Sequence, residues 1–295
     1  MKRIILFSLC LLTFSLQTIW GQKRGLTETR NVIERVTGKS DLPISLALKP
    51  GKGKLEGKTA FKYRVDHGVL KIEGSSPVAL CRGFYDFVKS NRAGLYSWSG
   101  NNIRFPQQLE DGTEKQVVSP FAHHYMFNVC TYGYSMPYWD WERWEKEIDW
   151  MALHGIDMPL ALVGYEAIIA RVWKKMGLTD EEINSYFVGP AHLPWMRMGN
   201  VSGIDDPLNK DWHRQQIALQ HKILNRMKSL GMKPICPGFP GFIPEAFKRI
   251  YPNLHIIQTH WVGCSKFRYK SDIKSARIQL VKLLTFNTLH CEIIL

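Results

Sequence analysis

The stretch from residue 125 to residue 167 constrains the fold of this chain more than any other. Two short apolar runs, at 125–130 and 156–163, flank a segment at 139–153 in which apolar residues recur at spacings of three and four. That spacing is typical of an amphipathic helix, so the order is strand, helix, strand. Such a βαβ unit has parallel strands, and its functional residues gather in the loops after the strands. We therefore expect an α/β protein with a site in these loops.

The loops that follow the two runs carry aromatic, amide and carboxylate side chains, a combination that suggests sugar binding. Aromatic faces pack on the apolar faces of pyranose rings, and Asn and Glu form paired hydrogen bonds with vicinal hydroxyls. The alternative is that the aromatic residues form the core, which we favour for Trp141, Trp144 and Trp150. For four residues of the loops we favour the site. They are Asn128, Tyr132, Tyr134 and Glu166.

Later parts of the chain repeat the same alternation of strand and helix. Apolar runs at 232–236 and 254–259 predict two more parallel strands. Four strands near residues 126, 158, 234 and 257 would make the first half of an eight-stranded βα barrel. The segment 186–201 is expected to be a long irregular loop, and its length argues for function.

The residues before this barrel predict a small α+β domain of their own. A strand at 42–48, a hairpin turning at 66–68 and a helix capped by Ser75 or Ser76 form one compact layer. The fold class is therefore α/β, with a small α+β N-terminal domain followed by a partial (β/α)8 (TIM) barrel.

Both ends of the chain differ from the parts between them. Residues 1–21 read as a secretory signal peptide, because Lys2 and Arg3 precede an apolar run at 4–16 that is too short to span a bilayer. We expect a secreted or periplasmic protein that does not bind a membrane. The tail after residue 262 is basic, with one predicted helix at 272–284. The predicted regions are 1–21 (signal peptide), 22–119 (N-terminal domain), 120–262 (partial barrel) and 263–295 (divergent tail).

Charge and cysteine content narrow the classes of partner. The net charge is +13, which would suit a sulfated glycan, although a basic surface without a ligand fits equally well. No cluster of Lys and Arg is interleaved with aromatic residues, so a nucleic-acid partner is not expected. The 6 cysteines show no CxxC or Cys/His spacing. We therefore expect neither a metal site nor a cofactor.

Several long motifs run through the chain between residues 27 and 261. They are NVCTYGYS, WDWERWEKEIDWMALHGI, GYEA, YFVGPAHLPWMRMGN and PGFPGFIPEA. These motifs resemble the α-N-acetylglucosaminidases of glycoside hydrolase family 89, which include a lysosomal enzyme of heparan sulfate breakdown and secreted bacterial relatives. The resemblance implies a retaining exo-glycosidase that hydrolyses terminal α-linked N-acetylglucosamine from glycans.

The resemblance also implies which residues hold the sugar. The chain departs from the family pattern at Tyr165, where Gln is usual, at Ile169 and Ala170, which replace a Trp-Gln pair, and at Met196, so fine specificity stays open. The implied substrate-binding residues are Asn128, Cys130, Tyr134, Glu166, Trp195 and Trp261.

The catalytic carboxyl groups are not found among the matched motifs. A retaining glycosidase needs two of them about 5–5.5 Å apart, and the resemblance places both further along the barrel. A catalytic Glu166 is the alternative, but Asp140 reads as a helix cap and Asp157 as the start of a strand, so neither supplies the second group. We therefore expect the catalytic residues beyond residue 295.

That expectation leaves three readings of the chain. The first is an exo-glycosidase truncated before its catalytic glutamates, and the second is a non-catalytic glycan-binding remnant. The third is a misfolded product of a broken reading frame, which is considered because the tail after residue 262 is divergent. Whether the chain is an enzyme, and its oligomeric state, are left open.

Overall fold

The computed structural model describes most of the chain, and by contacts the chain divides into two compact units. The first unit contains residues up to 126, 145–159 and 226–234, and the second contains 127–144, 160–225 and 235–295. The domain bounds given above stay a prediction. The predicted signal peptide, residue 21 excepted, and the predicted helix at 272–284 lie outside the described residues. The described residues are 21, 23–204, 208–236, 238, 241–253, 256–261 and 264–269.

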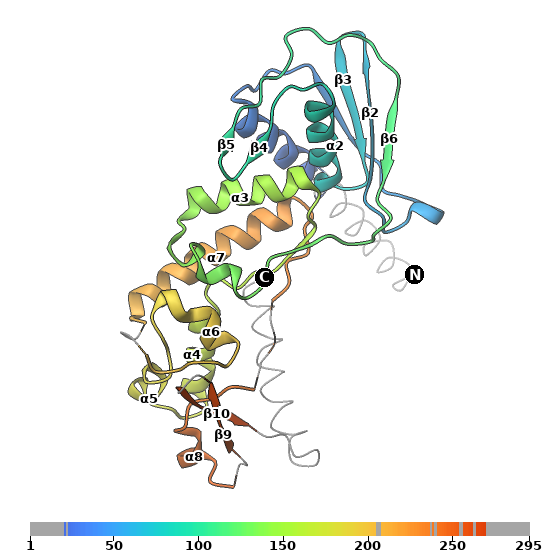
Figure 1. Ribbon diagram of the computed structural model, residues 1–295. Helices are drawn as coiled ribbons and strands as arrows, with labels where there is room; N and C mark the ends of the chain where they lie inside the picture. Colours follow the sequence, from blue (N-terminus) through green and yellow to red (C-terminus); the bar gives the residue numbers. More distant parts are fainter. Residues whose placement is uncertain are drawn as a thin grey trace, which may run out of the picture. The chain divides into compact units, whose positions relative to one another are not determined.

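A four-stranded sheet in the order β1-β3-β2-β6 forms one layer of the first unit (Figure 1). Its strands are β1 (Ile44–Leu48), β2 (Ala60–Asp66), β3 (Val69–Gly74) and β6 (Lys115–Val118). β1 pairs with β3 in parallel, and the other neighbours are antiparallel. The predicted hairpin is confirmed: His67 and Gly68 both have positive φ, 53° and 70°, as a tight turn between twisted strands requires.

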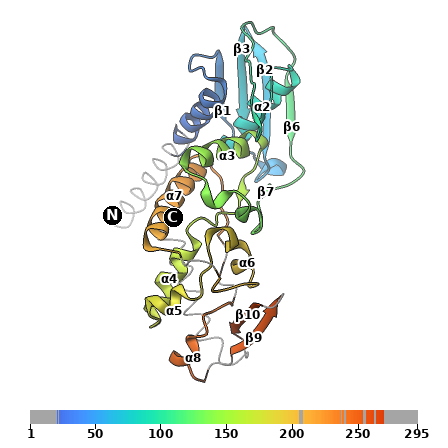
Figure 2. The same ribbon diagram turned by 60° about the vertical axis from the view of Figure 1, so that its left-hand side comes forward.

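Helix α2 (Pro77–Ser90) covers this sheet, as both ribbon views show (Figures 1 and 2). The Ser76 side chain accepts a hydrogen bond from the Ala79 N–H at 3.1 Å, so the predicted cap is confirmed at the second of the two serines. Val78, Phe84 and Val88 recur at helical spacing and are at most 1% exposed. Burial of this apolar stripe on the sheet holds the layer together.

The predicted βαβ unit is present. β7 (Tyr125–Met126) pairs in parallel with β8 (Met158–Pro159), and α3 (Trp141–His154) connects them. Asp140 accepts a hydrogen bond from the Arg143 N–H at 2.9 Å, so it caps the helix as predicted. This cap explains why α3 begins at Trp141 and not at residue 139.

Smaller elements complete the first unit. A helix over residues 23–37 precedes β1. The remaining elements are the 3₁₀ turn η1 (Gly53–Leu55) and the short strands β4 (Tyr96–Ser97) and β5 (Gly100–Asn101).

Five charged side chains form an ion-pair network inside the first unit. Arg35 donates two hydrogen bonds to the carboxylate of Asp149, at 2.7 and 2.8 Å. Arg35 also reaches Glu28 at 3.2 Å, and Arg226 joins Glu28 at 3.1 Å to Glu145 at 2.6 Å. The network thus ties the helix over residues 23–37 to α3.

The second unit consists mainly of helices, most of them short, and of α7 it contains residues 210–225. They are η2 (Thr131–Gly133), η3 (Met136–Tyr138), α4 (Tyr165–Lys175), α5 (Asp180–Asn184), η4 (Pro190–His192), α6 (Leu193–Arg197), α7 (Lys210–Ser229) and α8 (Phe247–Ile250). The capping box predicted at Thr179 and Glu182 is confirmed. Trp173, 1% exposed, packs on Phe187 and Phe247 at the centre of the core.

The segment 186–201 is not the irregular loop expected from the sequence, because η4 and α6 lie within it. Both helices are too short to show a helical apolar pattern. Each has a proline in its first turn, Pro190 and Pro194, where the missing N–H costs nothing.

The later barrel strands differ from the prediction. The third is reduced to a single parallel bridge between Leu160 and Ile235, supported by the Ala161 N–H bonded to the Ile235 oxygen at 2.8 Å. The prediction of a fourth parallel strand is wrong: β9 (Ile256–Trp261) pairs antiparallel with β10 (Cys264–Tyr269). An apolar run predicts a strand but not its partner, and a neighbouring strand costs little entropy to reach.

Candidate functional site

Asn128 begins the loop that follows β7, and its side chain shapes that loop. The Asn128 side-chain oxygen accepts hydrogen bonds from the N–H and the hydroxyl of Thr131, both at 2.9 Å. Asn128 is nevertheless exposed to solvent. Because the oxygen is used in this turn, the amide NH₂ group is the part of Asn128 that remains to donate hydrogen bonds to a ligand.

The aromatic residues of this loop divide between core and surface. Trp144 is fully buried, as predicted, and Tyr132 packs beside it with 3% exposure and a hydroxyl that donates to the Leu160 oxygen. Tyr132 is therefore a core residue and not the site residue we favoured. Tyr134 and Tyr138, by contrast, are 74% and 67% exposed. Two tyrosyl rings that follow Asn128 in the chain are thus presented to solvent.

Glu166 lies in the first turn of α4, directly after the apolar run that ends at Gly164. The Arg197 Nε donates to Glu166 Oε1 at 2.7 Å, and Nη2 donates to Oε2 at 2.9 Å. Only 3% of the Glu166 side chain and 7% of the Arg197 side chain are exposed. This is a buried, two-point ion pair, in which the planar guanidinium fixes the orientation of the carboxylate.

Helix α6 brings the predicted Trp195 to the loop after β7. The Cys130 Sγ lies 3.7 Å from the Met198 Sδ, just beyond the end of α6. A Cβ atom added to Gly133 would lie 2.1 Å from the Pro194 Cγ, so η2 and α6 approach as closely as a glycine permits. Trp195 itself is half-buried.

The structure therefore brings most of the predicted site residues into one part of the second unit. The loop that carries Asn128, Cys130 and Tyr134 meets the helix that carries Trp195, and Glu166 joins them through Arg197. Trp261 ends β9, but its side chain lies outside the described residues.

Arg197 belongs to the segment 186–201, whose length argued for function, but no role at the site was assigned to it from the sequence. A signal for it existed, because a lone carboxylate after an apolar strand needs a partner if it is buried. What the sequence did not supply was the identity of that partner among the 39 Lys and Arg residues.

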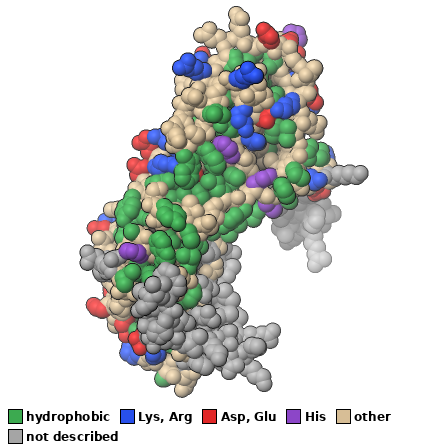
Figure 3. Space-filling model, viewed as in Figure 1, with side chains coloured by type: hydrophobic (Ala, Val, Ile, Leu, Met, Phe, Trp, Pro, Cys, Tyr) green, Lys and Arg blue, Asp and Glu red, His purple; other side chains and the backbone are tan. Residues whose placement is uncertain are grey.

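Basic side chains do not form a single patch on the face shown in Figure 3, where Lys and Arg are dispersed among other residues.

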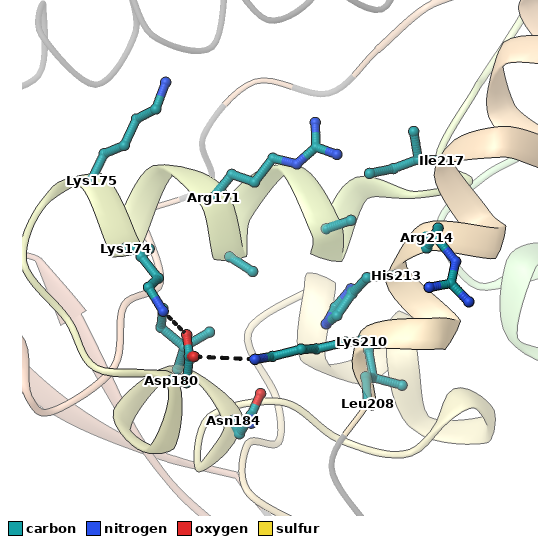
Figure 4. Close-up of a pocket in the computed structure, with 13 residues that line it drawn as sticks. Arg171, Lys174, Lys175, Asp180, Asn184, Leu208, Lys210, His213, Arg214 and Ile217 are labelled. Carbon is teal, nitrogen blue, oxygen red and sulfur yellow. Dashed lines mark hydrogen bonds and ion pairs between the residues drawn. The ribbon is translucent and has the colours of Figure 1, made fainter.

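A cavity of about 510 Å³ lies between α4, α5 and the start of α7 (Figure 4). Lys174 and Lys210 both pair with Asp180 there, and burial lowers the pKa of His213. None of the five predicted sugar-binding residues whose side chains the structure describes lines this cavity.

Three side chains of the first unit lie close enough together to share a cation: Asp66, His67 and Asp111. The Asp66 carboxylate already accepts a hydrogen bond from Lys71, which lowers the pKa of Asp66.

Across the part of the chain that the structure describes, no helix has the length and apolar character needed to cross a membrane.

Comparison with known families and proteins identifies the relatives of this chain. Residues 124–281 match the family model of the α-N-acetylglucosaminidase TIM-barrel domain, and residues 27–109 match that of its N-terminal domain. Human α-N-acetylglucosaminidase is 40% identical over 245 residues, which cover 80% of this chain and 32% of the human protein. The chain thus spans about a third of the length of this relative.

Solved structures of a family 89 glycoside hydrolase from Clostridium perfringens are similar to this chain. The complex with PUGNAc has a TM-score of 0.84 at 27% identity, covering 94% of this chain and 32% of that chain. A variant with two glutamate-to-glutamine substitutions, in complex with its substrate GlcNAc-α-1,4-galactose, has a TM-score of 0.84 at 26% identity and the same coverage.

Proposed function

Because the chain belongs to the α-N-acetylglucosaminidase family of glycoside hydrolases, we propose that it holds the terminal α-linked N-acetylglucosamine of a glycan. The proposal assigns the binding of the sugar, and not bond cleavage, to these residues. The proposed contacts are Asn128, Cys130, Tyr134, Trp195 and Trp261. Glu166 enters through Arg197, because its buried carboxylate already accepts two hydrogen bonds.

One observation carries this proposal: residues 130–133 pack closely on residues 194–198, so that two loops far apart in sequence form one surface. That surface offers an exposed ring at Tyr134, a half-buried ring at Trp195 and the amide of Asn128. Aromatic rings with a polar tip bury apolar area while remaining partly wet, which suits a pyranose. The relative bound to GlcNAc-α-1,4-galactose supports the class of sugar.

A binding measurement tests the proposal directly. The probe is 2-acetamido-1,2-dideoxynojirimycin, the compound bound to one of the similar structures, titrated into the full chain by calorimetry. Tyr134→Ala and Trp195→Ala should each weaken binding by about tenfold, the loss expected for about 1.4 kcal/mol of ring contact. Phe121→Ala is the matched control, because Phe121 is 65% exposed but belongs to the first unit. Equal affinities for all variants would contradict the proposal.

A second assay separates the whole-enzyme reading from a non-catalytic glycan-binding one. We expect no turnover of an aryl α-N-acetylglucosaminide by the chain, since both oxygens of the Glu166 carboxylate accept hydrogen bonds from Arg197 and a retaining glycosidase needs two carboxyl groups free to react. Turnover that Glu166→Gln abolishes would instead make Glu166 catalytic. A cooperative thermal transition of a monodisperse sample would exclude the misfolded product.

Secretion is part of the proposal as well. Its support is the pattern of Lys2 and Arg3 before an apolar run at 4–16. Recovery of the processed chain from the extracellular or periplasmic fraction of an expressing cell would test it, and an unprocessed chain confined to the cytosol would contradict it.

A further inference from the structure

Helix α6 has five residues, too few to hold its own conformation or orientation in water. The position of Trp195 on this helix must therefore come from contacts with the rest of the second unit. Arg197 lies two residues beyond Trp195 and makes the charged contact of the helix, with both Glu166 oxygens at 2.7 and 2.9 Å. Two parallel hydrogen bonds fix a guanidinium in its plane as one bond does not.

The other side of Arg197 faces the loop after β7. Its guanidinium carbon lies 5.9 Å from the centre of the Tyr132 ring, and the Tyr132 hydroxyl donates to the Leu160 oxygen. Arg197 thus contacts α4 through Glu166 and the loop of Asn128 and Tyr134 through Tyr132. One side chain therefore connects α4 to two segments that carry proposed sugar contacts, α6 and the loop after β7.

Direct contact of Arg197 with a ligand does not fit this arrangement. Its side chain is 7% exposed, and the Glu166 side chain is 3% exposed. The Nε and Nη2 groups of Arg197 and both Glu166 oxygens are turned toward each other, so these paired atoms are not presented to a ligand. A purely structural role would explain the burial. It would not explain why the pair connects the loops of the site, where the core of this unit, centred on Trp173, already supplies apolar packing.

We propose that Arg197 is a positioning residue, which orients Trp195 and the loop of Asn128 and Tyr134 for the sugar through its ion pair with Glu166. This inference rests on the proposed function for the identity of the ligand. The arrangement of Trp195 itself does not depend on a ligand, so it can be measured separately.

The chain offers a matched control for this test. Arg249 donates two hydrogen bonds to Glu182, at 2.8 and 2.6 Å, in the same unit. Its side chain is 55% exposed, and it joins α8 to α5, neither of which carries a proposed contact. Arg197→Lys and Arg249→Lys therefore each remove the two parallel hydrogen bonds of a guanidinium and keep the positive charge.

The experiment combines two readouts on the full chain labelled with 5-fluorotryptophan. The Trp195 ¹⁹F resonance is identified by its loss in Trp195→Phe. We expect Arg197→Lys to shift this resonance and to weaken binding of 2-acetamido-1,2-dideoxynojirimycin by about tenfold, the order expected for one lost charge-assisted hydrogen bond. Arg249→Lys should change neither the resonance nor the affinity.

The possible results distinguish a positioning role of Arg197 from a purely structural one. A lower melting temperature with an unchanged Trp195 resonance and unchanged affinity would overturn the inference and leave a structural ion pair. If the wild-type chain does not bind the probe, the proposed function fails, whereas the Trp195 resonance still tests the positioning. If circular dichroism shows that Arg197→Lys does not fold, Glu166→Gln gives the same test with both side-chain volumes kept.

Discussion

Among the described residues, each of the two units contains an Arg–carboxylate pair with two hydrogen bonds and a buried carboxylate, but the surroundings of the pairs differ. In the first unit, Arg35 and Asp149 belong to a network that continues through Glu28 to Arg226. In the second unit, no further ion pair joins Arg197 and Glu166 among the residues that the structure describes. The Arg35 side chain is 27% exposed, against 7% for Arg197.

On the proposal made for Arg197, the same interaction serves two purposes. The Arg35 network connects long elements, the helix over residues 23–37 and α3, so its loss should be felt as lost stability. The Arg197 pair connects short elements around the proposed site, so its loss should be felt in ligand binding as well. Since a buried pair often adds little net stability over apolar residues, its retention is better explained by the geometry it specifies.

The largest effect expected is on folding of the first unit. Asp149→Ala leaves the Arg35 charge without its main partner, and breaking a buried pair costs about 3–5 kcal/mol. Urea unfolding followed by fluorescence should show this loss. Glu245→Ala is the control, because Glu245 pairs with Lys248 at the surface and should change stability by less than about 1 kcal/mol. If Asp149→Ala lowered the free energy of unfolding no more than Glu245→Ala, the Arg35–Asp149 pair would not have the stabilising role given to it in this comparison.

The next effect distinguishes the two pairs by function. Asp149→Asn and Glu166→Gln each remove one buried charge and keep the shape of the side chain. We expect both to lower the free energy of unfolding, but only Glu166→Gln to weaken binding of the iminosugar probe, by about tenfold. Calorimetry on the two variants measures this. If Asp149→Asn weakened binding equally, the pairs would not differ in the way described.

A smaller effect concerns helix caps, of which each unit has a matched example. Ser76 caps α2 and Thr179 caps α5, so Ser76→Ala and Thr179→Ala should each cost about 1 kcal/mol. If the units unfold separately, each substitution should move only the transition of its own unit in a calorimetric scan. A shift of a single shared transition by both would show that the chain unfolds as one.

The smallest effect expected is that of pH. Burial lowers the pKa of His213 in the second unit and of His154 in the first. A depressed histidine pKa gives stability that is present above the unfolded value near about 6.5 and is lost as pH falls. Burial raises the pKa of Asp149 to about 6, which has the opposite sign: its contribution is present at low pH and is lost as pH rises through 6.

The two units should therefore respond differently to acid. In the first, the opposing shifts of His154 and Asp149 partly cancel between pH 7 and pH 5, whereas His213 in the second unit has no such counterpart among the described shifts. Urea unfolding at several pH values measures this. His213→Gln should flatten the dependence, and His67→Gln, at a residue whose side chain is 90% exposed, should not.

The features that the sequence predicted correctly are local ones. The cap at Asp140 and the capping box at Thr179 each join residues three positions apart, and the pairing of β7 with β8 joins consecutive strands of one βαβ segment. Such signals need no knowledge of the tertiary structure. The alternation of strand and helix, together with the family resemblance, predicted the rest of the fold class, including the barrel.

The features that the sequence did not predict depend on distant partners. Nothing near Glu166 identifies Arg197, 31 residues later, as its partner. β9 was correctly expected to be a strand, but its pairing with β10 depends on competition between partners. Tyr132 and Tyr134 are two residues apart with opposite exposure, because Trp144 and Leu160 lie on one side of the loop only.

The close approach of Gly133 to Pro194 makes two positions of the sequence interdependent. Gly133 does not have a positive φ, so its backbone would accept any residue, and glycine is required only by its neighbour. The requirement is therefore conditional: a smaller residue at position 194 would release it. In evolutionary terms, these two sites form an epistatic pair, in which a change that is harmful alone becomes tolerated on the background of the other.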